Sequence, residues 1–298
     1  MNDFVLSCCT TADLTEQKFK ERNIPYLCYH YVLGDTQYVD DLGKTRSMHE
    51  FYTAMKNGAA TKTSMVSVGE YYDYFKSFLS QGKDVLHLTL SSGITGGYSS
   101  ALTAKTMLDG EFPDRKLYIV DSLAASSGYG LLMDKLADLR DEGMSIDEVN
   151  QFALDHRLEM NHWVFSTTLE YYVRGGRISK TAGFFGNMLG ICPIIHVNAD
   201  GKLIPGEKAM GVKVAQKRLL SKMEKLAKDG LDYSDKVYIS HSDVPDEAQS
   251  LAKLIEAKFP KIKGHVEIFD IGTTIGAHTG PGTVALFFWG AKREDHSK

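Results

Sequence analysis

Short apolar runs alternate with capped helical segments in the first half of the chain, and this alternation restricts the fold more than any other feature. Ser-x-x-Glu capping boxes open three of the expected helices, at Ser47, Ser67 and Ser145. Strands that alternate with helices in this way imply right-handed crossovers and a parallel sheet. The apolar runs predict strands at residues 4–7, 25–32, 85–90 and 116–121.

After residue 160 the pattern changes. The tetrapeptide Asn198-Ala199-Asp200-Gly201 separates two strand-like segments and predicts a β-hairpin, so the second half needs a sheet with antiparallel pairs. We therefore expect an α/β fold with two domains. Residues 1–160 would form a three-layer α/β/α domain with a parallel sheet, and residues 161–298 a two-layer α/β domain with a mixed sheet. Residues 61–64 are expected to form a polar loop and residues 271–282 a glycine-rich loop.

Composition and charge argue against several classes of protein. The net charge is −4, and the clustered Lys and Arg residues of a nucleic-acid surface are absent. Asp3 and Asp13 flank the first apolar run, unlike a signal peptide, and the apolar run at 284–289 is too short to cross a bilayer. The four cysteines lack the spacing of a zinc site. We expect a cytoplasmic protein with no membrane span, no nucleic-acid partner and no metal site.

The loop at residues 91–97 is a candidate anion site. It follows the expected strand 85–90 and precedes a helix that starts near Tyr98. Free backbone N–H groups and hydroxyls at such a helix start suit a phosphate or a carboxylate. The alternative is an ordinary strand-to-helix turn that uses glycine for its conformation. The residues concerned are Ser91, Ser92, Gly93 and Gly96.

Two further segments carry groups that suit an anion. Arg174 and Arg177 flank two glycines and could clamp an anion, although a single surface arginine is usually only a solvated charge. His278 lies in a glycine-rich stretch, where it could donate a hydrogen bond or carry a proton. The chain has neither a G-x-S-x-G nucleophile elbow nor an ATP-binding P-loop, so no cofactor is expected in this chain.

Residues 178–189 read as an apolar helix interrupted by glycines. Each glycine costs about 1 kcal/mol of helix stability relative to alanine, so something must approach this backbone closely. Either a neighbouring element or the chain of a ligand would do so. The residues concerned are Gly183, Phe184, Gly186 and Met188.

Taken together, these motifs resemble the DegV family over nearly the whole chain. Each match is short, but six of them follow one another at the spacing of the family. They are Thr11-Ala12-Asp13-Leu14, Thr63-Ser64, residues 91–101, Asp121-Ser122 with Gly128 and Gly130, residues 169–179, and residues 276–282.

The resemblance implies that a long-chain fatty acid binds between two α/β domains. It places the carboxylate-binding hydroxyls on Thr63 or Ser64 and on Ser91 or Ser92, and the family histidine on His278. Arg177, with Arg174 in reserve, would support phosphoryl transfer. If a ligand chain is what approaches the glycine-interrupted segment, the acyl chain of this acid would lie along it. In fatty acid kinases such a protein presents the acid to a separate subunit that holds ATP and magnesium. Met210 stands where the family often has an arginine linked to this transfer.

We therefore expect a fatty-acid-binding protein, with or without a fatty acid kinase subunit as partner. The alternative is an enzyme that acts alone, a hydrolase or acyl-transfer enzyme using Ser91 or Ser92 with His278. A bound carboxylate needs several donors to offset its desolvation, which hydroxyls and helix-start amides can supply.

Overall fold

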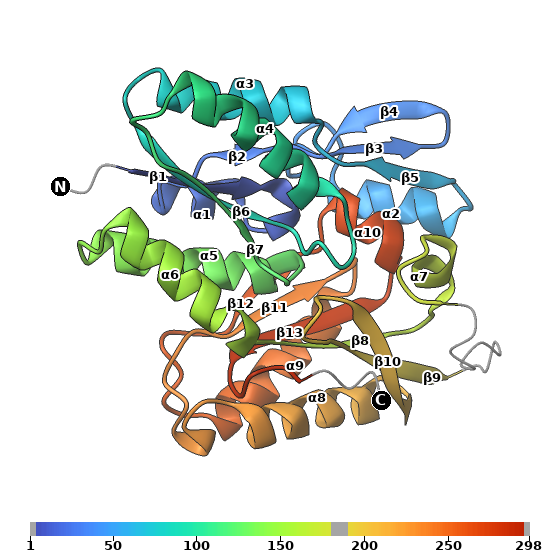
Figure 1. The fold of residues 1–298 in the computed structure, drawn as a ribbon. Coiled ribbons are helices and arrows are strands. Elements are labelled where there is room, and N and C mark those ends of the chain that lie inside the picture. The colour runs from blue at the N-terminus through green and yellow to red at the C-terminus, as the bar shows by residue number, and fades with distance from the viewer. Residues whose placement is uncertain (1–3, 180–189, 295–298) are drawn as a thin grey trace.

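The computed structural model describes residues 4–179 and 190–294. A four-stranded parallel sheet forms the centre of the first half, in the order β2-β1-β6-β7 (Figure 1). Val85 lies beside Val5 on one side and Leu117 on the other. The strands are β1 (Phe4–Cys9), β2 (Tyr26–Leu27), β6 (Asp84–Thr89) and β7 (Leu117–Asp121).

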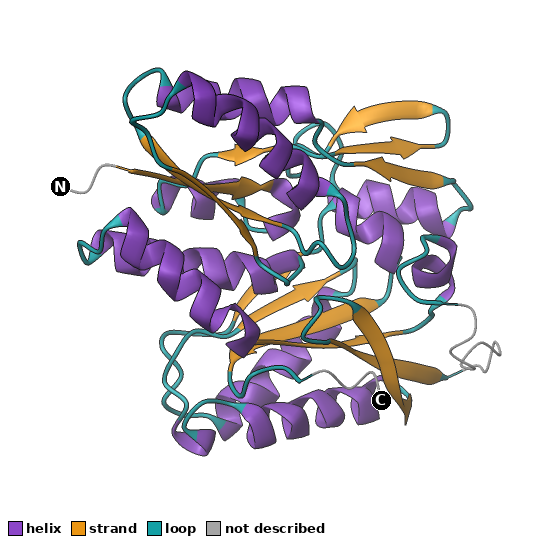
Figure 2. Ribbon diagram, in the orientation of Figure 1, coloured by secondary structure: helices purple, strands orange, loops and turns teal. Residues whose placement is uncertain are grey.

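Helices cover both faces of this sheet, which gives three layers (Figure 2). Residues on one face, such as Leu6 and Leu88, pack with Phe19 and Tyr129, whereas Val85 on the other face packs with Phe75. All three predicted capping boxes are confirmed. The first face carries α1 (Glu16–Glu21), α5 (Ser126–Asp141) and α6 (Ile146–His156), and the second carries α3 (Val68–Leu79) and α4 (Gly97–Glu111).

A small antiparallel sheet, in the order β4-β3-β5, corrects two expectations. The single strand predicted at 25–32 is divided between two sheets, because its residues from 30 onward pair with the other strands of this small sheet. Residues 61–64 form a strand and not a loop, since alternate side chains are half-buried and Thr63 pairs with Tyr31. The elements are β3 (His30–Leu33), β4 (Thr36–Val39), β5 (Thr61–Ser64) and the adjoining α2 (Met48–Lys56).

A six-stranded mixed sheet forms the second half, in the order β10-β9-β8-β13-β11-β12. Only β11 and β12 are parallel within it. The predicted hairpin joins β9 and β10, with Val197 opposite Leu203. The strands are β8 (Met160–Ser166), β9 (Ile191–Val197), β10 (Leu203–Met210), β11 (Tyr238–His241), β12 (Glu267–Asp270) and β13 (Thr283–Trp289).

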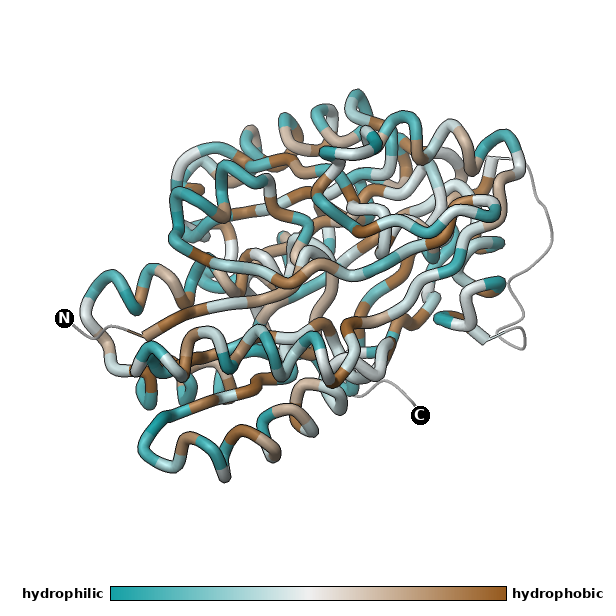
Figure 3. The backbone as a smooth tube through the Cα atoms, turned by 90° about the horizontal axis from the view of Figure 1, so that it is seen from above, coloured by the Kyte–Doolittle hydropathy of each residue, from teal (hydrophilic) through white to brown (hydrophobic). Residues whose placement is uncertain are grey.

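One face of the mixed sheet carries α8 (Val212–Leu226) and α9 (Pro245–Lys258), and its other face contacts α5. Apolar residues follow the strands of both sheets, while polar residues are frequent on the outer helices (Figure 3). The predicted α/β class, with one parallel and one mixed sheet, is confirmed. Within the described residues, no helix is both long enough and apolar enough to cross a membrane.

The expected glycine-rich loop at 271–282 contains a helix, α10 (Thr273–Thr279). Thr274 anchors its first turn, because its backbone N–H and its hydroxyl both donate to Oδ2 of the buried Asp40, at 3.2 and 2.6 Å. Gly276 allows the Tyr52 ring to approach, since a Cβ there would lie 2.3 Å from the Tyr52 hydroxyl. The helix packs against α2, β3, β5 and α7 (Glu170–Arg174), so the end of the chain meets the small sheet.

Candidate functional site

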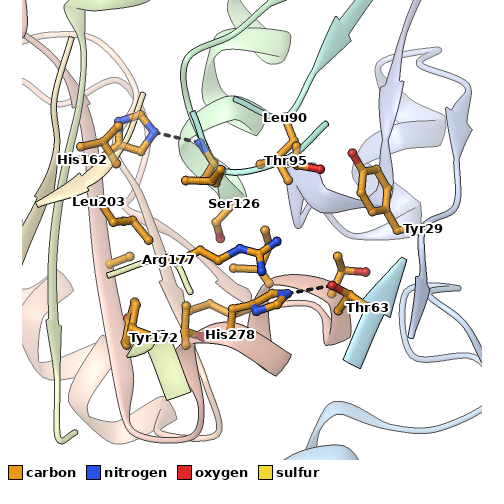
Figure 4. A pocket seen from close by; sticks show the side chains of 18 of the residues that line it. Tyr29, Thr63, Leu90, Thr95, Ser126, His162, Tyr172, Arg177, Leu203 and His278 are labelled. Carbon is orange, nitrogen blue, oxygen red and sulfur yellow. Dashed lines mark hydrogen bonds between the residues drawn. The ribbon is translucent and has the colours of Figure 1, made fainter. Parts of the chain in front are cut away.

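A cavity of about 530 Å³ lies where the two halves of the chain meet. Its walls come from β5, the loop before α4, the start of α5, the inner face of the mixed sheet and α10 (Figure 4). This volume is typical of a small-molecule site. Much of the lining is apolar, from Leu90, Ile94, Val164, Val197, Leu203, Ile271, Ile275, Ala285 and Phe287.

One end of the cavity is polar and brings together two predicted residues that are far apart in the sequence. Oγ1 of Thr63 on β5 lies 2.7 Å from Nε2 of His278 on α10. Burial, together with the nearby charges of Arg177 and Arg174, lowers the pKa of His278 from 6.5 to about 4. His278 is therefore neutral at pH 7, and its bond to Thr63 joins two uncharged groups.

Arg177 extends into the cavity beside this pair (Figure 4). Its Nη1 donates to the carbonyl oxygen of Gly175 at 2.6 Å, which fixes the side chain in place. Burial lowers its pKa, and among the described residues it has no carboxylate partner. No Asp or Glu is among the described lining residues, so the cavity holds an uncompensated positive charge.

The residues of the predicted anion loop have two different roles: some line the cavity, and others form the contact between the two halves. Gly96 lines the cavity, as does Ser64 from β5, whereas Ser91, Ser92 and Gly93 are not among the lining residues. The buried Ser91 hydroxyl donates to the carbonyl oxygen of Gly201 at 2.8 Å. A Cβ on Gly93 would lie 2.4 Å from the carbonyl oxygen of Asp200. These residues thus hold the β9–β10 turn against the loop.

The hydrolase alternative needs a hydrogen bond between Ser91 or Ser92 and His278, and the described residues do not form one. His278 is bonded to Thr63, and the Ser91 hydroxyl is used by the hairpin turn. Arg174 is exposed, with its guanidinium 4.7 Å from the centre of the Tyr171 ring, and does not line the cavity. The predicted acyl-chain residues Gly183, Phe184, Gly186 and Met188 lie outside the described residues.

Several lining residues were not found by the sequence analysis. Ser126 begins α5, and its hydroxyl donates to Oδ2 of Asp13 at 2.5 Å. Some, such as His162, Val164 and Phe287, project from strands, where alternation marks them as inward-facing but does not distinguish a cavity wall from a packed core. Others are not in strands: Tyr29 lies between β2 and β3, and Thr95 and Tyr172 lie within matched motifs that do not single them out.

Comparison with known proteins places the chain among homologues of the same length. A DegV domain-containing protein of Clostridium perfringens is 34% identical, with 99% of this chain and 100% of the relative covered. A fatty acid binding DegV family protein of Streptococcus agalactiae is 26% identical with a TM-score of 0.81, covering 96% of this chain and 98% of that one.

A third similar protein shares the fold at lower sequence identity. It is the fatty acid kinase (Fak) B3 protein of Streptococcus pneumoniae, solved loaded with linoleic acid. It is 21% identical, has a TM-score of 0.81 and covers 97% of this chain and 99% of that one. The model of the family described as "Uncharacterised protein, DegV family" matches residues 10–290. The chain belongs to the DegV family.

Proposed function

We propose that this protein binds a long-chain fatty acid in the cavity between its two halves. The observation that carries the proposal is Arg177, a half-buried cation at the polar end of a largely apolar cavity, with no counter-ion among the described residues. Holding such a charge away from water is costly unless an anion pairs with it. An amphipathic anion satisfies both ends of the cavity, and the S. agalactiae relative is named for fatty acid binding.

The carboxylate would lie near Arg177 and the Thr63–His278 pair. Thr63 and Ser64 can donate hydroxyl protons, and Gly96 lies at the start of α4, where backbone N–H groups are free of helix acceptors. The acyl chain would follow the apolar wall. Each methylene that leaves water contributes about 0.8 kcal/mol, so a long chain supplies most of the affinity.

Native mass spectrometry of the purified protein tests this proposal, together with lipid extraction and titration with a fluorescent fatty acid. The expected result is a co-purified fatty acid that exchanges with added ligand. A protein that carries only polar ligands and binds no fatty acid in the titration would refute the proposal.

We further propose that the bound acid is presented to a separate kinase subunit, which would supply ATP and magnesium. The Fak B3 neighbour supports this role. Met210 on β10 is 71% exposed and stands where the family often has an arginine. A methionine supplies no cation at this position, so we expect slow phosphoryl transfer. The test mixes the protein, oleate, ATP-magnesium and candidate kinase subunits, and traps acyl phosphate with hydroxylamine. Failure with every subunit, for both the wild type and Met210→Arg, would refute this role.

A further inference from the structure

A second void of about 240 Å³ adjoins the proposed fatty-acid cavity, because the two share lining residues. Its lining combines the apolar side chains of Trp163 and Leu226 with polar and charged ones, among them Arg293. Two residues line both spaces, His162 on β8 and Val197 on β9. In Figure 4, His162 lies on the opposite side of the cavity from Thr63.

His162 is held rigidly in this position. Its Nε2 accepts a hydrogen bond from the backbone N–H of Ala125 at 3.3 Å, and its Nδ1 donates to the carbonyl oxygen of Met160 at 3.0 Å. Because both ring nitrogens are used, the side chain offers no polar group to a ligand. It meets the cavity as a neutral ring, and burial keeps it neutral by lowering its pKa.

Two neighbouring residues also pack against the His162 ring. Its ring packs edge-on against Phe287, with 5.1 Å between ring centres. Gly128 on α5 lies directly against both rings, since a Cβ there would lie 2.4 Å from Phe287 and 2.5 Å from Nε2 of His162. Val197, 4% exposed, is the second shared residue.

We propose that His162 and Val197 form an end wall that sets the longest acyl chain this protein accepts. This inference rests on the proposed fatty-acid binding and adds a chain-length limit to it. A chain whose carboxylate is held near Arg177 extends towards His162, where its methyl end meets a fixed ring. Opening the wall would join the cavity to the second void and admit further carbons.

Titration of a saturated series from about 12 to 22 carbons tests the wall, because each added buried methylene strengthens binding by about fourfold. The wild-type affinity should rise with length and then stop rising at one chain length. In Val197→Ala and His162→Ala, the rise should continue for about two more carbons, a gain of up to roughly fifteenfold for the longest chains if both added methylenes leave water. Val197→Ala is the cleaner variant, because it breaks no side-chain hydrogen bond.

Val164→Ala is the matched control. This substitution also removes two methyl groups, from a residue on β8 near His162, but Val164 lines the first cavity and is not among the described residues that line the second void. It should leave the limiting chain length unchanged. The wall is refuted if that length is the same in all four proteins, or if Val164→Ala moves it as far as Val197→Ala does. Absence of binding at every length in the wild type would instead overturn the fatty-acid proposal itself.

Discussion

Replacing Arg177 with methionine tests the central electrostatic argument, because methionine keeps an apolar stem and removes the charge. A hydrogen bond to a charged group contributes about 1.5–3 kcal/mol. Loss of the pairing should therefore weaken fatty-acid binding by roughly 10-fold to 150-fold. A fatty alcohol of the same length has no charge to lose, so its affinity should change much less.

The same substitution should hardly affect the stability of the delipidated protein. It removes the bond from Nη1 to the Gly175 carbonyl, worth about 1.5–3 kcal/mol because the donor is charged, but it also relieves the desolvation of a cation that has no carboxylate partner among the described residues. We expect the free energy of unfolding to stay within about 1 kcal/mol of the wild type.

The assay is a fluorescence competition titration with acid and alcohol, run beside urea unfolding. Arg174→Met is the control, because Arg174 is exposed, stacks on Tyr171 and does not line the cavity. Equal losses of acid and alcohol affinity in Arg177→Met would refute the reasoning. So would a loss of several kcal/mol in stability, which would make Arg177 a structural residue.

Three further predictions concern the polar end and the contact between the halves. Thr63→Val should weaken acid binding by about 1–3 kcal/mol in the same titration, whereas Ser92→Ala, outside the cavity lining, should not. The folded-state pKa of His278 is about 4, below its ordinary 6.5, so protonation of His278 favours the unfolded state. Lowering the pH from 6.5 to 4 should therefore remove roughly 3 kcal/mol of the folding stability through this group. Urea unfolding of the delipidated wild type and His278→Gln across this range should show their difference shrinking as the pH falls; a constant difference would contradict the shift. Gly201→Ala should lower the melting temperature more than Gly34→Ala does. Both glycines have a positive φ, but of these two positions only 201 would place a Cβ against Ser91, 2.0 Å from its Oγ. Equal decreases would mean that backbone strain alone accounts for the loss.

Much of the fold could be predicted because its signals are local. The capping boxes at Ser47, Ser67 and Ser145 depend on residues three positions apart, and the β9–β10 hairpin follows from its turn. The strand β5 and helix α10 were missed because their causes are distant. β5 forms by pairing with Tyr31 and its neighbours, and α10 is anchored by Asp40, more than two hundred residues earlier.

The polar end of the site shows the same division between local and distant causes. Thr63, Arg177 and His278 could each be singled out from their sequence surroundings and the family resemblance. Their meeting depends on α10 crossing to the small sheet, which no local pattern expresses. Residues such as His162 could not be found, because an inward position on a strand is the same in the sequence whether it faces a cavity or a packed core.

The glycines of the predicted anion loop show why a correct motif can carry an ambiguous meaning. A glycine indicates that something approaches the backbone closely, but not what approaches. At Gly93 it is the carbonyl oxygen of Asp200 in the hairpin turn, whereas Gly96, three residues later, lines the cavity. One short motif therefore both joins the two halves and forms part of the site between them. Changes at Ser91 or Gly93 that loosen the hairpin turn would consequently alter the cavity without touching a ligand, so binding measurements on such variants need a parallel measurement of stability.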